Sequence, residues 1–344
     1  MPERQRQKTD VGLLRPRTGG FRLRRFMLIV RGVRTLTTIR VGTRGSRLAV
    51  AQTEGVVKNL KELNPGLETE IIVIKTLGDE ITDKPLATVG GKGLFVKEIE
   101  TALLNNEIDV AVHSLKDLPG ELPAGLQITA IPKRLAPFDA FVSSKYRYLS
   151  DLPKNAKVGT GSARRKAELL RYRSDLEIVP MRGNVDTRLK KLDDGEADAI
   201  ILAQAGLERL GLQERIKAVI GMNILLPAAG QGALVLETRS DDNITNMIAE
   251  ALHDPASAMC VLAERAFMQT LGGDCDIPAA ALAEACCGNV ILTGAIFSAN
   301  GHNGFVESVV SSEAASIVGA QKLAQRLLEM GGDKILAELK QANA

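Results

Sequence analysis

One cysteine lies in a glycine-rich stretch with distinctive chemistry. The segment Leu271-Gly-Gly-Asp-Cys-Asp-Ile-Pro278 follows a helix-like run and ends at a proline, which stops further helix. Its two glycines permit backbone conformations that few other residues adopt, so the turn can present Cys275 to a ligand. Free cysteine is also among the most buried side chains, and taken alone Cys275 fits a small buried hydrophobe better.

Cations and glycines recur in four loops that follow predicted strands. Two of these loops also open predicted helices, whose free first-turn N–H groups favour anions. The loops are Thr43–Ser46, Gly90–Gly93, Thr160–Arg165 and Met181–Arg188, and their cations are Arg44, Lys92, Arg164, Arg165, Arg182 and Arg188. A single arginine is usually a solvated surface charge. Four such loops together indicate a polyanionic ligand, carboxylated because the planar guanidinium binds carboxylate with two hydrogen bonds.

A carboxylate also directly follows a predicted strand, as the cationic loops do. Asp117 lies in Val112-His-Ser-Leu-Lys-Asp-Leu-Pro119, directly after a predicted strand. Ligands of α/β sheets bind outside the carboxyl ends of the strands. In an arginine-rich site Asp117 could therefore stabilise a cationic intermediate or act as a general acid or base. The alternative is an ordinary loop aspartate that caps the next element.

Composition excludes several classes of function. The 344 residues are 45% hydrophobic and 25% charged, the balance of a soluble globular protein with two or three domains. Residues 1–39 hold ten Lys/Arg and two Asp/Glu, and removing them from totals of 44 and 41 leaves 34 basic and 39 acidic residues. That body is not of the nucleic-acid-binding kind. Four cysteines without CxxC spacing and three scattered histidines argue against a disulfide framework and a metal site.

Residues 1–38 form an Arg-rich, acid-poor extension that we expect to be disordered. The composition is partly that of an organelle transit peptide, but the stretch contains no serine. Its apolar run Phe26–Val30 is too short for a secretory signal or a membrane segment. Targeting and an upstream start preceding Met27 stay open. We favour a cytoplasmic protein without membrane contact.

An internal repeat predicts two similar α/β domains. Val41-Gly-Thr-Arg-Gly-Ser46 returns as Val158-Gly-Thr-Gly-Ser162, and residues 105–112 return as residues 194–201. Two copies of one strand–helix alternation imply two mainly parallel sheets, facing each other across a cleft. The predicted domains are residues 39–132 with 233–250, residues 138–228, and an α+β domain at 255–344 that carries Cys275.

Together these motifs resemble the porphobilinogen deaminase (hydroxymethylbilane synthase) family, from about Arg40 to the C-terminus. The shared motifs are Gly42–Ser46, Gly90–Phe95, His113–Asp117, Arg164-Arg165, Arg182–Asn184 and Leu271–Cys275. The resemblance implies two periplasmic-binding-protein-like α/β domains that form a cleft, plus a smaller α+β C-terminal domain. It also implies a monomeric transferase of tetrapyrrole (heme or chlorophyll) biosynthesis. Such an enzyme condenses four porphobilinogen molecules head to tail on an enzyme-bound dipyrromethane primer, releases ammonia and gives hydroxymethylbilane.

The resemblance also implies roles for individual residues. Cys275 would carry the dipyrromethane cofactor through a thioether, and Asp117 would assist loss of the substrate's amino group and stabilise the resulting cation. The other implied cofactor contacts are Lys116, Asp117, Thr160, Ser162, Arg164, Arg165, Gly183 and Arg188. The implied substrate contacts are Arg44, Ser46, Lys92, Arg182 and Arg209. No metal is implied. Thr88 and Phe138 stand where lysine and arginine are frequent in the family.

A non-catalytic two-domain anion-binding protein is the alternative. It would need neither Cys275 nor Asp117, and an exported form would carry a secretory signal. The motif set favours the enzyme, since fold alone permits both.

Overall fold

The computed structural model describes residues 38–76, 96–272 and 277–342. These residues belong to one compact unit, Leu36–Ala344. Within the described ranges no helix is long and apolar enough to cross a membrane. The extension at 1–37 lies outside them, as do Lys92, Thr88 and Cys275.

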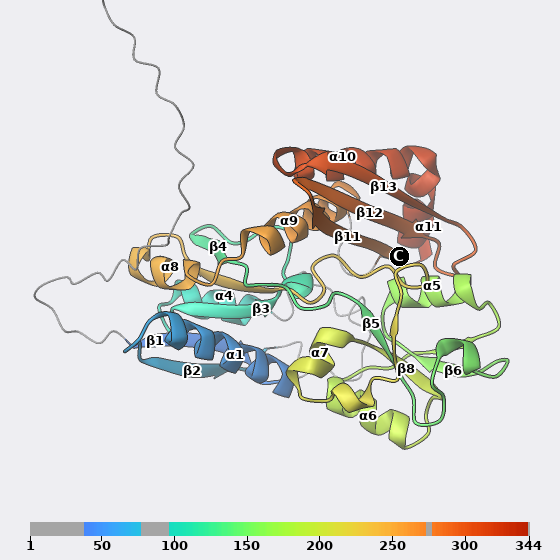
Figure 1. Cartoon of the computed structure of the whole chain (residues 1–344), viewed down its shortest axis with the longest axis horizontal. Helices are drawn as coiled ribbons and strands as arrows, with labels where there is room; N and C mark the ends of the chain where they lie inside the picture. Colours follow the sequence, from blue (N-terminus) through green and yellow to red (C-terminus); the bar gives the residue numbers. More distant parts are fainter. Residues whose placement is uncertain (1–37, 77–95, 273–276, 343–344) are drawn as a thin grey trace, which may run out of the picture. The chain divides into compact units, whose positions relative to one another are not determined.

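The first α/β domain is built on a five-stranded sheet in the order β2-β1-β3-β10-β4 (Figure 1). Its first three strands are parallel, and β10 lies antiparallel between β3 and β4. The strands are β1 (Ile39–Arg44), β2 (Thr69–Ile74), β3 (Val110–Ser114), β4 (Leu126–Ala130) and β10 (Leu234–Arg239). The helices that contact this sheet are α1 (Arg47–Leu63), α4 (Lys97–Leu104) and α8 (Asn243–Glu250).

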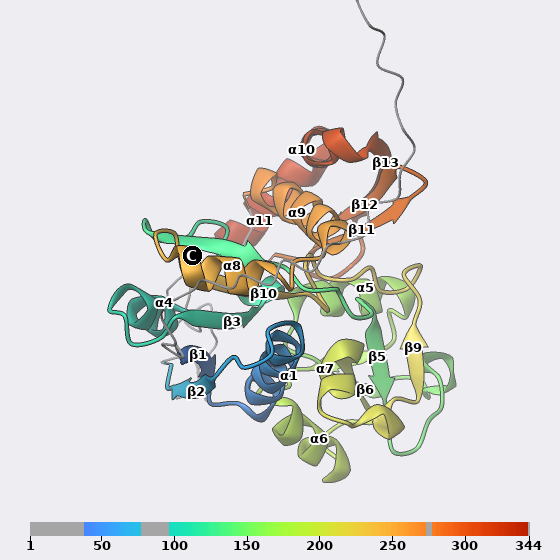
Figure 2. The ribbon, with the colours of Figure 1, turned by 60° about the vertical axis from the view of Figure 1, so that its left-hand side comes forward.

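The second α/β domain repeats this plan in the order β7-β6-β8-β5-β9. Figure 2 labels its strands β5, β6 and β9. Again three strands are parallel, and β5 lies antiparallel between β8 and β9. The strands are β5 (Asp139–Val142), β6 (Lys157–Gly159), β7 (Glu177–Val179), β8 (Ala199–Ala203) and β9 (Ala218–Ile220). The helices are α5 (Ala163–Tyr172), α6 (Val185–Asp193) and α7 (Gln204–Arg209). The two strand orders correspond position for position, which confirms the prediction of two similar α/β domains.

The repeated sequence explains the repeated structure. Gly42 in β1 and Gly159 in β6 hold equivalent places, and a Cβ there would meet Ile108 Cδ1 at 2.3 Å and Met181 Cε at 2.7 Å. Each strand then turns into a helix at a serine whose side chain accepts a first-turn N–H. Ser46 caps α1 and Ser162 caps α5 in this way.

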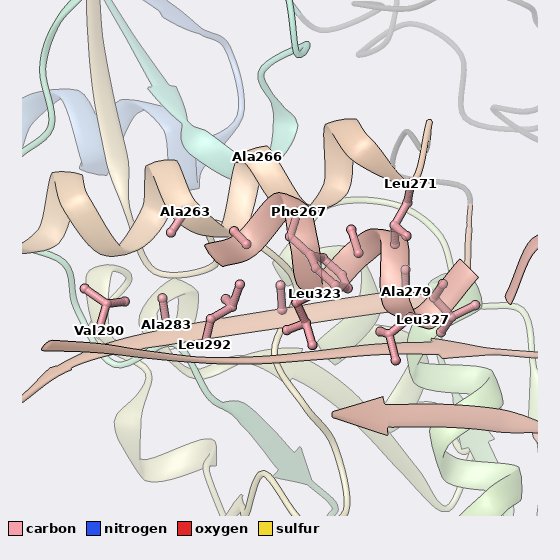
Figure 3. Packing of buried hydrophobic residues seen from close by; sticks show 14 of the residues in the cluster. Ala263, Ala266, Phe267, Leu271, Ala279, Ala283, Val290, Leu292, Leu323 and Leu327 are labelled. Atoms are coloured by element: carbon pink, nitrogen blue, oxygen red, sulfur yellow. The ribbon is translucent and has the colours of Figure 1, made fainter. Parts of the chain in front are cut away.

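The third domain is a three-stranded antiparallel sheet that packs against α9 and α10 (Figure 1). Its elements are α9 (Pro255–Thr270), β11 (Ala279–Cys286), β12 (Asn289–Phe297), β13 (Gly304–Ser312), α10 (Ser316–Leu327) and α11 (Asp333–Ala342). Phe267 on α9 is fully buried between the sheet and Leu323 and Leu327 of α10 (Figure 3). Helices and a sheet together agree with the α+β character predicted for this part of the chain, although the alanine-rich composition of β11, taken alone, favours helix. The predicted domain boundaries stay a prediction.

Short helical turns connect these elements. They are η1 (Leu115–Asp117), η2 (Leu149–Asp151), η3 (Gln213–Arg215), η4 (Glu313–Ala315) and the π-helical η5 (Leu328–Gly332).

Packing against Phe267 leaves no room for a side chain at Gly294. A Cβ at Gly294 would lie 2.4 Å from Phe267 Cε2. Overpacking a dense core costs about 1–3 kcal/mol, so Gly294→Ala should lower Tm by a few degrees. Gly55→Ala is the matched control, because nothing lies within 4 Å of that position in α1 and alanine favours helix by about 1 kcal/mol. Melting followed by circular dichroism checks both, and an unchanged Tm for Gly294→Ala would contradict the packing.

Candidate functional site

The site begins where β3 ends. The turn η1 follows β3 directly and carries Lys116, which is half-buried, and Asp117, which is exposed. The turn is anchored by Leu115, whose side chain is buried and whose N–H donates to Ala233 O at 3.1 Å. Asp117 therefore projects from a fixed support at the carboxyl end of a central strand.

Charges from the second domain act on this turn. Burial lowers the pKa of Lys116; Asp117 opposes that shift and Arg165 adds to it. Burial also lowers the pKa of Arg188 to about 10, with Arg165 and Arg182 adding to the effect and Asp117 opposing it. Interactions of this kind need proximity, so residues from both α/β domains share one electrostatic environment. The structure thus brings together Lys116, Asp117, Arg164, Arg165, Arg182 and Arg188.

Asp139 holds the two adjacent arginines in place. Its side chain is fully buried; Oδ1 accepts from Arg165 Nη2 at 2.7 Å and from Nε at 3.1 Å, and Oδ2 accepts from Arg164 Nη2 at 2.8 Å. Gln231 Nε2 donates to the same Oδ1 at 2.9 Å. Although burial opposes it, Arg164 and Arg165 hold the pKa of Asp139 well below its usual range. The carboxylate stays charged and orients both guanidiniums.

Glu168 completes the buried cluster. Its Oε2 accepts from Arg164 Nη1 at 3.1 Å and its Oε1 accepts from Leu226 N at 2.8 Å. Burial raises the pKa of Glu168 to about 7, with Arg164 opposing the shift. The buried Nε of Arg164 has no acceptor among the described residues. One guanidinium N–H is therefore left for a further acceptor.

The cluster carries an excess of positive charge. The five cations Lys116, Arg164, Arg165, Arg182 and Arg188 face the three carboxylates Asp117, Asp139 and Glu168. Protonation of Glu168 raises the excess further. A site with this imbalance favours an anionic ligand, and guanidiniums favour carboxylates in particular.

Other predicted contacts have local structural partners. Ser46 Oγ accepts from Ala49 N at 3.2 Å and Ser162 Oγ accepts from Arg165 N at 3.4 Å, so both act as helix caps. Thr160, which is buried, accepts from Ser162 N at 3.2 Å. Gly183 has a φ of 102°, where glycine is favoured, and its carbonyl accepts from Arg188 Nε at 2.8 Å.

Arg209 is placed differently. It donates to Gly232 O at 2.8 Å, on the segment that leads into β10, and burial lowers its pKa to about 10. The charge that acts most on Arg209 is that of Glu208, and not that of Asp117 or of the arginine cluster. Arg44 ends β1 and is half-buried. The substrate-binding roles of both residues stay predictions, as do the roles of Lys92 and Cys275 outside the described residues.

The sequence did not point to Asp139, Glu168 or Gln231. Glu168 could have been found, because it lies four residues after Arg164, the spacing of helical ion pairs. Asp139 lies 25 residues before Arg164, so no short sequence spacing indicates that the two side chains pair. Phe138, at a position where the family often has arginine, packs against the apolar cluster of Ala167, Leu226 and Phe297.

Comparison with known proteins settles the family. The model for "Porphobilinogen deaminase, dipyromethane cofactor binding domain" matches residues 39–247, and the model for the C-terminal domain of the same family matches residues 258–330. The chain belongs to the porphobilinogen deaminase family. Porphobilinogen deaminase of Syntrophotalea carbinolica is 47% identical over 304 residues, 88% of this chain and 96% of that protein. Its counterpart from Geobacter sulfurreducens is 46% identical over 310 residues, 89% of this chain and 96% of that protein.

Among solved structures the likeness is more distant. A nutrient binding protein from Burkholderia cenocepacia bound to methionine has a TM-score of 0.41 and 16% identity, and the match covers 63% of this chain and 92% of that one.

The described residues fit the cofactor that the family model names. Dipyrromethane carries carboxylates, and the cluster offers excess positive charge together with the unpartnered Nε of Arg164. All residues of the cluster lie within the residues 39–247 that match the cofactor-binding domain. Arg164, Arg165, Arg188 and Lys116 are the cations with which this deaminase family member would hold the group.

Removing the charge of Asp139 tests the buried network. Asp139→Asn leaves two buried guanidiniums without their shared counter-ion, and losing one partner of a buried ion pair costs about 3–5 kcal/mol. Asp186→Asn is the control, because Asp186 forms an exposed pair with Arg47, of a kind worth about 0–1 kcal/mol. Urea denaturation should show a much larger loss for Asp139→Asn. Equal losses would contradict the central place of Asp139.

Glu168 should make stability depend on pH. The folded-state pKa is about 7 against 4.5 for the unfolded chain, so between these values only the folded chain keeps the proton. The stabilisation from this group is full below about pH 4.5 and is lost as pH rises through 7. The Tm of wild type minus the Tm of Glu168→Gln should therefore decrease as pH rises from about 5 to about 7.5. Thermal melts at several pH values in that range measure this difference. Glu62→Gln, on the exposed face of α1, should show no such trend.

Proposed function

We propose that this chain is a porphobilinogen deaminase that condenses four porphobilinogen molecules head to tail, releases ammonia and gives hydroxymethylbilane. The observation that carries the proposal is the exposed carboxylate of Asp117 within reach of an arginine cluster drawn from the other α/β domain. Each pyrrole brings an acetate and a propionate, so a growing chain needs many cations around one reacting group. No observation on the described residues favours the non-catalytic alternative.

Asp117 is the residue we assign to the chemistry. The aminomethyl group, protonated as an ammonium, leaves as ammonia with the electron pair of the broken C–N bond, and the pyrrole is left cationic. The Asp117 carboxylate, fixed at the end of β3, stabilises that positive charge as it develops. It can also accept the proton lost when the new C–C bond forms. The bound dipyrromethane supplies the first acceptor carbon and a set of carboxylates.

The cations divide the binding work. Arg164 and Arg165 are buried and held by Asp139, so they present fixed N–H groups. Arg182 precedes α6 and Arg188 lies on it, and both side chains are half-buried. We assign them to the carboxylates of the growing chain. Because these groups bind substrate, primer and product chain alike, their loss should weaken binding more than it slows the chemical step.

Attachment of the cofactor to Cys275, a monomeric state and a cytoplasmic location belong to the same proposal. Mapping the adduct by peptide mass spectrometry tests the attachment, and sedimentation velocity tests the oligomeric state.

The function is tested by comparing wild type with Asp117→Asn. Wild type should show an intact mass increased by two condensed pyrroles and should form hydroxymethylbilane from porphobilinogen. Asp117→Asn should retain that added mass but lose turnover by about 10²–10³-fold, the usual effect of one lost electrostatic group.

Arg188→Leu serves as the contrast in the same experiment. It removes a ligand-binding cation and should lack the added mass or accumulate one intermediate chain length. Normal turnover by Asp117→Asn would sink the catalytic assignment, and a wild-type protein without activity would sink the proposed function.

A further inference from the structure

Two neighbouring cysteines meet at the tip of the β11–β12 hairpin. Cys286 ends β11 and pairs with Asn289, so Cys287 and Gly288 form the two-residue turn. Both cysteines are exposed, and their Sγ atoms lie 3.4 Å apart. We infer that Cys286 and Cys287 form a binding site for one soft, thiophilic monovalent cation, Cu(I).

The turn is what brings the two thiols together. Successive side chains in a strand point to opposite faces, which would separate neighbouring cysteines. Here Cys287 has a φ of 53° and Gly288 a φ of 76°, the pattern of a turn with positive φ at both central residues. The reversal places the Cys287 thiol beside that of Cys286.

Packing does not explain the choice of cysteine at this turn. Asn or Gly is usual at the first central position, and a larger residue with positive φ is uncommon. The Cys287 side chain is exposed, so its strained backbone is not offset by burial in a core. A costly local conformation that persists without a packing reason indicates a function of the side chain.

A disulfide between the two residues is disfavoured by geometry. Neighbouring Cα atoms are about 3.8 Å apart across a trans peptide. Disulfides usually need about 4.4–6.8 Å between Cα atoms, and shorter spans store strain that makes the bond easy to reduce. The pair is therefore available as two thiols.

The number of ligands selects the ion. Thiolates favour soft ions such as Cu(I) and also bind zinc, but a structural zinc site needs four ligands. Among the described residues no group of three or more His, Cys, Asp or Glu side chains could hold a metal. Two thiols thus suit an ion that accepts two soft ligands. Their Sγ atoms lie 3.4 Å apart, which places both thiols within reach of one ion.

The exchange conserves charge and oxidation state. Two S–H bonds break, two Cu–S bonds form, two protons pass to solvent and copper remains Cu(I).

The test is an anaerobic titration of the cofactor-bearing full-length protein with Cu(I) against a bathocuproine disulfonate competitor. Wild type should withdraw one equivalent of Cu(I). Cys286→Ser and Cys287→Ser should each weaken binding by more than about 100-fold, the upper end of what losing an outer-shell partner costs.

Two further variants serve as controls. Cys260→Ala, which removes a buried thiol, and Cys275→Ser, which removes the thiol predicted to carry the cofactor, should both keep the site. Unchanged affinity in either hairpin variant, or loss of binding in Cys275→Ser alone, would overturn the inference. The site does not depend on the proposed deaminase activity, so neither result bears on that activity.

Discussion

The site depends on one buried carboxylate between two arginines. Without Asp139, neighbouring guanidiniums would have to be buried against their mutual repulsion and their loss of water. With it, each arginine has a fixed direction, and Arg165 also donates to Ile201 O at 2.9 Å on the central strand β8. Gln231 connects this network to Pro137 O at 2.6 Å. The interaction that permits buried arginines therefore also positions the two segments that precede β5 and β10.

A second buried carboxylate connects the third domain to those same segments. Glu264 on α9 accepts from Arg134 at 2.6 and 3.1 Å, from Gly230 N at 2.6 Å and from Ala283 N at 2.8 Å. Arg134 Nε donates in turn to Gln231 O at 2.8 Å. The networks of Asp139 and Glu264 thus share Gln231. The helix that leads toward Cys275 is held by the residues that orient the arginines.

The sequence predicted the parts of this structure that repeat and are local. The two Val-Gly-Thr segments and the loops after them were found from patterns within about ten residues of each other, whereas Ser46 and Ser162 were predicted as ligand contacts and not as the helix caps they form. The antiparallel strands β5 and β10 were not predicted, because pairing with a strand distant in the sequence leaves no periodic signal. The arginines were predicted as the cations of one site, and Arg164, Arg165, Arg182 and Arg188 lie in one electrostatic environment, while their binding roles stay a prediction. Asp139, the acceptor shared by Arg164 and Arg165, depends on a tertiary contact between segments 25 residues apart, which no motif records.

The two buried acids differ in charge state, and this leaves part of the arginine cluster able to bind an anionic ligand. Asp139 stays ionised and fixes geometry, whereas Glu168, with a pKa of about 7, is close to half-protonated at neutral pH. An anion placed near Arg164 would compete with Glu168 for that guanidinium and raise the Glu168 pKa further, since like charges disfavour ionisation. Ligand binding and proton uptake at Glu168 are therefore coupled, and the cluster gains positive charge as negative charge arrives.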